Sequence, residues 1–223
     1  MIAVPNQVPF TVRACFQKSS RGIHLGVAVV VAVALQLFAP HGFAESEALI
    51  VVGLAGDETD AEHFKTLAER TAKLLTARGI AAERVAVLSS RPDGKVTRER
   101  IMAALRATAA RIKAEDEFWL VLYGHAGRSS SGSPAFQVSG PRLTAEDLQE
   151  TLQAITARRN VFIATEKSGT FLPFLADANC TALAATAEAG EVSQPRFPEH
   201  WVEALAENPK ASLAALAARA AQR

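Results

Sequence analysis

Apolar runs alternate with amphipathic segments along most of the chain, and the two patterns predict different elements. Five runs have the length and composition of strands that are buried on both faces of a sheet: 47–56, 84–90, 117–124, 160–165 and 180–186. Elsewhere, apolar residues recur every three or four positions, as in helices that pack one face on a core: 60–79, 97–116, 143–155, 170–175, 200–209 and 210–223. This order predicts an α/β three-layer sandwich, in which a mainly parallel sheet is covered by helices on both faces.

Several residues at the ends of these segments are typical of helix caps and turns. Asp60 is expected to cap the first helix, and Gly79 to end it. Thr144, followed three residues later by Asp147, predicts a capping box. The stretch 125–134, HAGRSSSGSP, is rich in Ser and Gly, and we expect it to be flexible.

The first 44 residues predict export. Residues 25–39 form an apolar run interrupted only by Gln36, basic residues precede it, and small residues follow at Gly42 and Ala44. These are the parts of a secretory signal peptide, and the run is shorter than the roughly 20 residues that a spanning helix needs. We therefore expect a signal peptide over 1–44, cleavage after Ala44, and one periplasmic or secreted domain over 45–223. A retained membrane anchor is the alternative.

The charge balance argues against nucleic acid or a lipid surface as a partner. The whole chain has 24 basic and 23 acidic residues. Removal of the leader takes away Arg13, Lys18 and Arg21 and no acid, which leaves a net charge of −2. A chain of this charge has no field that attracts phosphate backbones or anionic headgroups. We expect no contact with nucleic acid, and none with the membrane after cleavage.

Three strand ends carry the residues that favour chemistry, because ligands gather at the carboxyl ends of parallel strands. His125 follows the third strand and is a candidate general base or ligand contact, or simply a loop histidine. Glu166 follows the fourth strand and is a candidate acid–base partner. Ser168 is either a nucleophile or, by the usual preference of serine, a helix cap.

No cofactor or metal is predicted. The glycines of GLAG after the first strand lack the full pattern of a dinucleotide site. His63 and His200 lack the spacing of zinc ligands. Cys180, the single cysteine after the leader, begins an apolar run and is expected to pack as a small hydrophobe.

The motifs YGHAG and TEKSG, at the ends of the third and fourth strands, resemble those of the caspase–legumain-like cysteine peptidases. The resemblance covers most of 45–223, and it includes the LTAEDL helix start and the segment AATAEAGEVSQPRFPEHWVEAL. It implies a caspase-like fold with His125 as general base. Ala126 then stands where a glycine N–H serves the oxyanion hole, with Gly127 beside it, and Arg196 lies in the loop of the substrate pocket.

The resemblance places Glu166 where the family has its catalytic cysteine. A carboxylate is a poor nucleophile towards an amide, so the sequence predicts a peptidase homologue without activity. We expect it to act as a binding or scaffold domain for a peptide or protein partner. The alternative is a hydrolase of non-standard chemistry that uses His125 with Glu166 or Ser168. A homodimer is a further hypothesis, because related folds pair their sheets edge to edge across a dimer.

Overall fold

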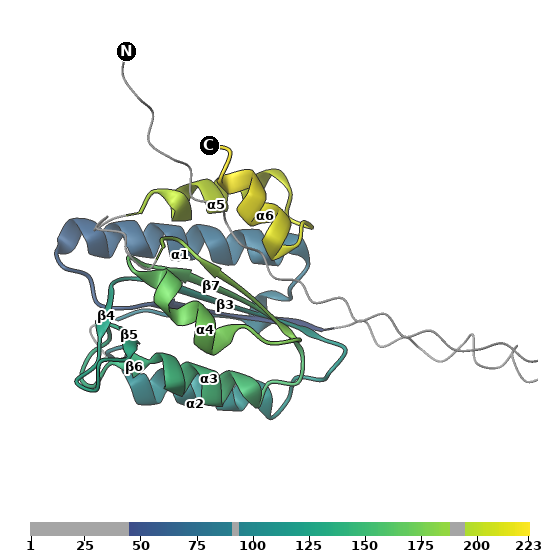
Figure 1. Ribbon diagram of the computed structural model, residues 1–223. Helices are drawn as coiled ribbons and strands as arrows, with labels where there is room; N and C mark the ends of the chain where they lie inside the picture. Colours follow the sequence, from purple (N-terminus) through teal and green to yellow (C-terminus); the bar gives the residue numbers. More distant parts are fainter. Residues whose placement is uncertain (1–44, 91–93, 188–194) are drawn as a thin grey trace, which may run out of the picture. The chain divides into compact units, whose positions relative to one another are not determined.

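A five-stranded parallel sheet forms the centre of the fold in the computed structural model, which describes residues 45–90, 94–187 and 195–223 (Figure 1). The predicted signal peptide lies outside the described residues. The strand order is β2-β1-β3-β7-β8, and all neighbours are parallel. The strands are β1 (Ser46–Val52), β2 (Val85–Leu88), β3 (Glu117–Tyr123), β7 (Arg158–Ala164) and β8 (Cys180–Ala184).

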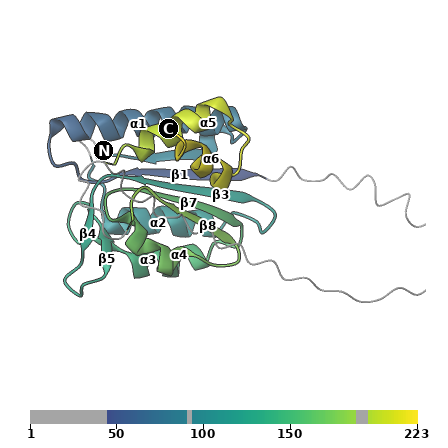
Figure 2. The ribbon, with the colours of Figure 1, turned by 45° about the horizontal axis from the view of Figure 1, so that its top comes forward.

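Helices cover both faces of this sheet, as Figures 1 and 2 show. One face carries α1 (Glu58–Arg78), α5 (Phe197–Glu207) and α6 (Leu213–Ala220). The other face carries α2 (Arg98–Ala109), α3 (Ala145–Gln153) and the short α4 (Leu172–Leu175). Two single-turn 3₁₀ helices complete the set: η2 (Ala82–Arg84) and η3 (Ser168–Phe171). The predicted three-layer α/β sandwich is confirmed.

The central strands are apolar along most of their length because each strand supplies two cores. Along β3, Phe118, Leu120 and Leu122 pack beneath α2 and α3. The intervening Trp119, Val121 and Tyr123 pack beneath α1 and α5. Successive side chains of a strand point to opposite faces, so a strand between two helical layers is apolar wherever both layers cover it.

The Ser/Gly-rich stretch after β3 forms part of a second, antiparallel sheet, and the prediction of a flexible segment is wrong. β4 (Ala126–Arg128) pairs with β5 (Pro134–Phe136), which pairs with β6 (Leu143–Thr144). Between β4 and β5, Ser129 N donates to Ser133 O at 2.8 Å, and Gly132 adopts a φ of 89°. The small polar residues therefore build the turn of a hairpin.

Two of the predicted helix caps are confirmed and one, at the start of α1, is not. Thr144 and Asp147 form the predicted capping box of α3, and Gly79 ends α1 with a φ of 113°. At the start of α1, however, Asp57 is the N-cap, and its side chain accepts from Asp60 N. The prediction that Asp60 is the cap is wrong. Its carboxylate has a different role, described next.

Candidate functional site

The site lies where β3 and β7 end side by side. Tyr123 of β3 pairs with Ala164 of β7, so His125 and Glu166 each follow two residues beyond a paired position. Gly124 makes the turn before His125 with a φ of 148°, a conformation that glycine adopts without steric cost. Register and turn together bring His125 and Glu166 to one edge of the sheet.

The Glu166 carboxylate contacts the His125 ring and the Ala126 main-chain N–H, which both follow β3. Its Oε2 lies 3.3 Å from His125 Nδ1, and its Oε1 accepts the Ala126 N–H at 2.9 Å. The Glu166 side chain is only 15% exposed. The sequence prediction that these residues lie together is thereby met, and Ala126 is part of the contact. Gly127 continues into β4, where it pairs with Ala135.

A third residue, Asp60, completes the cluster and was not predicted. Its Oδ2 lies 3.1 Å from His125 Nε2, from the first turn of α1, and Asp60 is buried. Phe64, one helical turn later, packs edge-on against the His125 ring at 5.4 Å between centroids. The sequence signal that could have identified Asp60 is its i, i+4 spacing from Phe64, which puts both residues on one face of a helix that covers the sheet.

His125 is thus held between two carboxylates, one at each ring nitrogen. A neutral imidazole donates from one nitrogen and accepts at the other, whereas an imidazolium donates from both. Two carboxylate oxygens at hydrogen-bond distance therefore fit the imidazolium form. Each ring nitrogen of His125 thus has a carboxylate partner, Glu166 at Nδ1 and Asp60 at Nε2.

Ser168 belongs to a different contact. It is buried, and its Oγ accepts from Thr186 N at 3.0 Å and lies 3.3 Å from Thr186 Oγ1. Ser168 is the first residue of η3, and the N-cap is Lys167, whose side chain makes no cap hydrogen bond, so the cap prediction is wrong. The structure does not bring Ser168 Oγ to His125: its hydrogen bonds tie the corner after β7 to the end of β8.

A narrow cavity adjoins Glu166, with a volume of about 10 Å³, enough for about one water molecule. Arg196 does not line it: the residue is exposed just before α5 and has no ion pair within the described residues. The lining residues are His63, Phe64, Leu67, Tyr123, Gly124, Ala164, Glu166, Pro195 and Pro198.

Cys180 lies at the far end of the sheet from this cluster. It opens β8 opposite Arg159, at the start of β7, whereas Glu166 follows the end of β7. It packs against the core under α2 and α3, and burial raises the pKa of its thiol to about 11. The contact with the core confirms the expected packing role. A thiol this hard to ionise is also a weak nucleophile.

The described residues offer few other sites of recognisable chemistry. Within 45–90, 94–187 and 195–223, no three His, Cys, Asp or Glu side chains are arranged to hold a metal ion. No helix in that part of the chain has the length and apolar character needed to cross a bilayer.

Comparisons with known proteins support the fold and no more. No family model and no curated protein matches this sequence. Among solved structures, the chain is similar to protein GSU0716 from Geobacter sulfurreducens, with 15% sequence identity and a TM-score of 0.51. The match covers 73% of this chain and 82% of the other. At this identity the similarity shows a shared α/β architecture alone.

Proposed function

We propose that this chain is an exported, peptidase-like binding domain without peptidase activity. The observation that carries the proposal is the position of the Glu166 carboxylate, which binds His125 and the Ala126 N–H together. Attack on an amide requires a nucleophile, a base with an unprotonated nitrogen, and an N–H donor for the developing oxyanion. Glu166 replaces the first of these and occupies the other two.

The contacts of Glu166 also explain why a carboxylate is stable at this position. A carboxylate carries negative charge on two oxygens, as a tetrahedral oxyanion carries it on one. Ala126 N–H and the His125 ring would serve either group. In this proposal Glu166 is a permanent occupant of the place that a reaction intermediate fills in an active peptidase. The framework is retained and its chemistry is blocked.

The charge around the cavity favours a basic partner. Glu166 places a carboxylate in the cavity lining, and a second carboxylate, that of Glu199, lies 3.2 Å from the lining residue His63. The remaining lining is mostly apolar. We expect a peptide or protein segment that presents a Lys or Arg to Glu166, with its apolar stem against Phe64 and Pro198. The cavity is too small for a whole side chain, so the segment lies across its mouth.

The test is a mixed peptide library incubated with the purified protein under reducing conditions, with cleavage and retention both measured by mass spectrometry. We expect no cleavage above background and retention of peptides that contain Lys or Arg. Glu166→Gln should reduce that retention, and Ser168→Ala, which alters a contact outside the cluster, should not. Cleavage that disappears in His125→Ala would overturn the proposal.

A second candidate is a hydrolase that uses His125 and Glu166 as an acid–base pair. The 3.3 Å contact between His125 Nδ1 and Glu166 Oε2 favours it, because acid–base partners must lie within hydrogen-bond reach. In that case a hydrolytic activity found with small ester or amide substrates should be lost in Glu166→Gln. An activity that survives both Glu166→Gln and Ser168→Ala would remove this candidate.

A further inference from the structure

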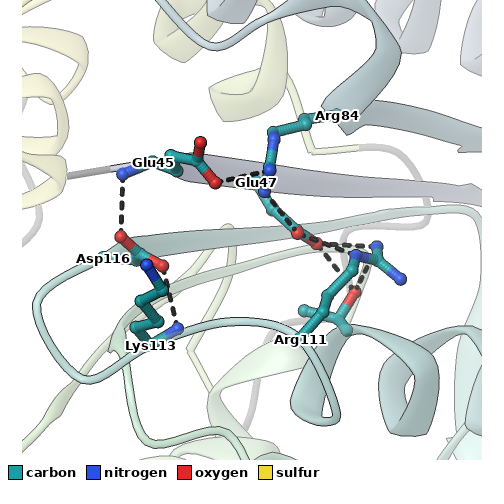
Figure 3. Close-up of polar contacts among 7 residues, drawn as sticks. Glu45, Glu47, Arg84, Arg111, Lys113 and Asp116 are labelled. Carbon is teal, nitrogen blue, oxygen red and sulfur yellow. Dashed lines mark hydrogen bonds and ion pairs between the residues drawn. The ribbon is translucent and has the colours of Figure 1, made fainter. Parts of the chain in front are cut away.

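The first described residue of the chain is held at both of its polar groups. The Glu45 main-chain N donates to Asp116 Oδ1 at 2.7 Å, and its side-chain carboxylate forms an ion pair with Arg84 (Figure 3). Asp116 Oδ2 accepts from Lys113 N at 2.8 Å. Glu45 itself is exposed, whereas Asp116 is 5% exposed. The Glu45 main-chain nitrogen therefore points at a nearly buried carboxylate.

The neighbouring buried carboxylate shows what Asp116 lacks. Glu47 is 1% exposed and is paired with Arg84 and with Arg111, which binds both of its oxygens at 2.7 and 2.8 Å. Asp116 accepts hydrogen bonds from two main-chain N–H groups, and within the described residues no Lys, Arg or His side chain forms an ion pair with it. A carboxylate withdrawn from water is costly unless a cation pairs with it.

We propose that the chain is cut between Ala44 and Glu45, and that the new α-amino group of Glu45 is the cation that pairs with Asp116. A protease of the export pathway and one water supply the step. The C–N bond of Ala44–Glu45 breaks, Ala44 gains a carboxylate, and Glu45 N becomes an ammonium group. Small residues at Gly42 and Ala44, after the apolar run, fit such a cut.

The cut changes the charge of the Glu45 nitrogen that faces Asp116 and leaves the position of that nitrogen unchanged. Before cleavage, an amide N–H faces Asp116. After cleavage, a charged ammonium faces it from the same atom, and hydrogen bonds between charged groups are about twice as strong as neutral ones. The ion pair between Glu45 and Arg84 fixes the residue in place, so little freedom is lost when the new pair forms. Processing therefore stabilises the domain as well as releasing it. This inference shares with the proposed function the expectation of export, and it does not depend on peptide binding.

The experiment begins with the full chain, expressed in a bacterial host that exports it. Intact mass should show Glu45 as the first residue of the purified protein. A second chain carries a specific protease site placed so that Ala44 remains as one extra residue. It moves the ammonium group away from Asp116, and we expect its Tm to be lower by about 2–6 °C, the scale of a single ion pair in a domain of this size.

Asp116→Asn should abolish the Tm difference between the two forms. Asp177→Asn is the matched control, because Asp177 lies in an ion pair with Arg159 that does not involve the amino terminus, and it should leave the difference intact. Since Asp116→Asn can itself impair folding, acylation of the α-amine is a second measurement on the unsubstituted forms. The Glu45 amine should react several-fold more slowly than the Ala44 amine. A first residue other than Glu45, or equal Tm values and equal acylation rates, would overturn the proposal.

Discussion

His125→Ala offers the most direct measure of what the cluster of Asp60, His125 and Glu166 contributes. The substitution removes the ring that lies 3.1 Å from Asp60 and 3.3 Å from Glu166. It leaves two carboxylates close to each other without the group between them. The three side chains are 19%, 10% and 15% exposed for His125, Asp60 and Glu166. Water can therefore replace only part of what is lost.

The expected loss follows from these contacts. A hydrogen bond to a charged group contributes about 1.5–3 kcal/mol, and removal of one partner from a buried ion pair costs about 3–5 kcal/mol. Glu166 keeps its bond from the Ala126 N–H, and the cluster retains some exposure, so the lower end of that range applies. We expect the free energy of unfolding to fall by about 3 kcal/mol. For a domain of this size, that lowers the Tm by about 6–12 °C.

His63→Ala is a matched control within the same chain. His63 also pairs with a carboxylate, Glu199, at 3.2 Å, but the two side chains are 41% and 36% exposed. Exposed pairs of this kind contribute about 0–1 kcal/mol. Urea unfolding of both variants at pH 7, followed by circular dichroism, gives the comparison. A His125→Ala variant that is as stable as His63→Ala, or more stable than the unsubstituted protein, would refute the reasoning. It would indicate a strained catalytic residue instead.

Four further substitutions test other parts of the structure. The Arg98 guanidinium lowers the pKa of Asp147 to about 2, below its ordinary 3.8, so the ion pair stabilises the fold above about pH 4 and is lost as the pH falls through 2. Because Arg98 is a third exposed, Asp147→Asn should cost about 1–2 kcal/mol in urea unfolding at pH 7 and much less near pH 2. Gly53→Ala would place a Cβ 2.5 Å from Gln137 O and should lower the Tm by several degrees, whereas Gly127→Ala, with its nearest atom at 3.7 Å, should leave it nearly unchanged. Ser168→Ala removes the acceptor of Thr186 N and should cost about 1–2 kcal/mol while leaving peptide retention intact; a loss of retention would place Ser168 in the site after all.

The layers of the fold could be predicted from the sequence because the signals were long and periodic. The strands β1, β3 and β7 each contain an unbroken apolar run, and Thr144 with Asp147 marks the start of α3 by local chemistry alone. The hairpin after His125 could not be predicted from composition. Serine and glycine are common both in flexible segments and in tight turns, and only pairing with β5 and β6 distinguishes the two.

Only the residues of the site that follow the ends of strands could be predicted from the sequence. His125 and Glu166 meet because β3 and β7 are neighbours in register, which the topology implies. Asp60 was missed because it reaches the site across 65 residues of sequence, from a helix of the covering layer. An Asp at the start of a helix is also typical of a cap, and the true cap, Asp57, lies one turn earlier. Ser168 was misassigned because a serine before a helix is usually its cap, whereas here Thr186 supplies a better partner.

The uniform strand direction of the central sheet has a consequence for the speed of folding. None of its four strand pairs forms by closing a hairpin, because every one is parallel and needs a crossover through a helix. Sheets of this kind depend on contacts between distant parts of the chain, and they fold over roughly milliseconds to seconds. A newly made chain therefore spends that interval with its strands unpaired. The delay leaves the apolar strands open to pairing between chains. Refolding yield should consequently fall as the protein concentration rises.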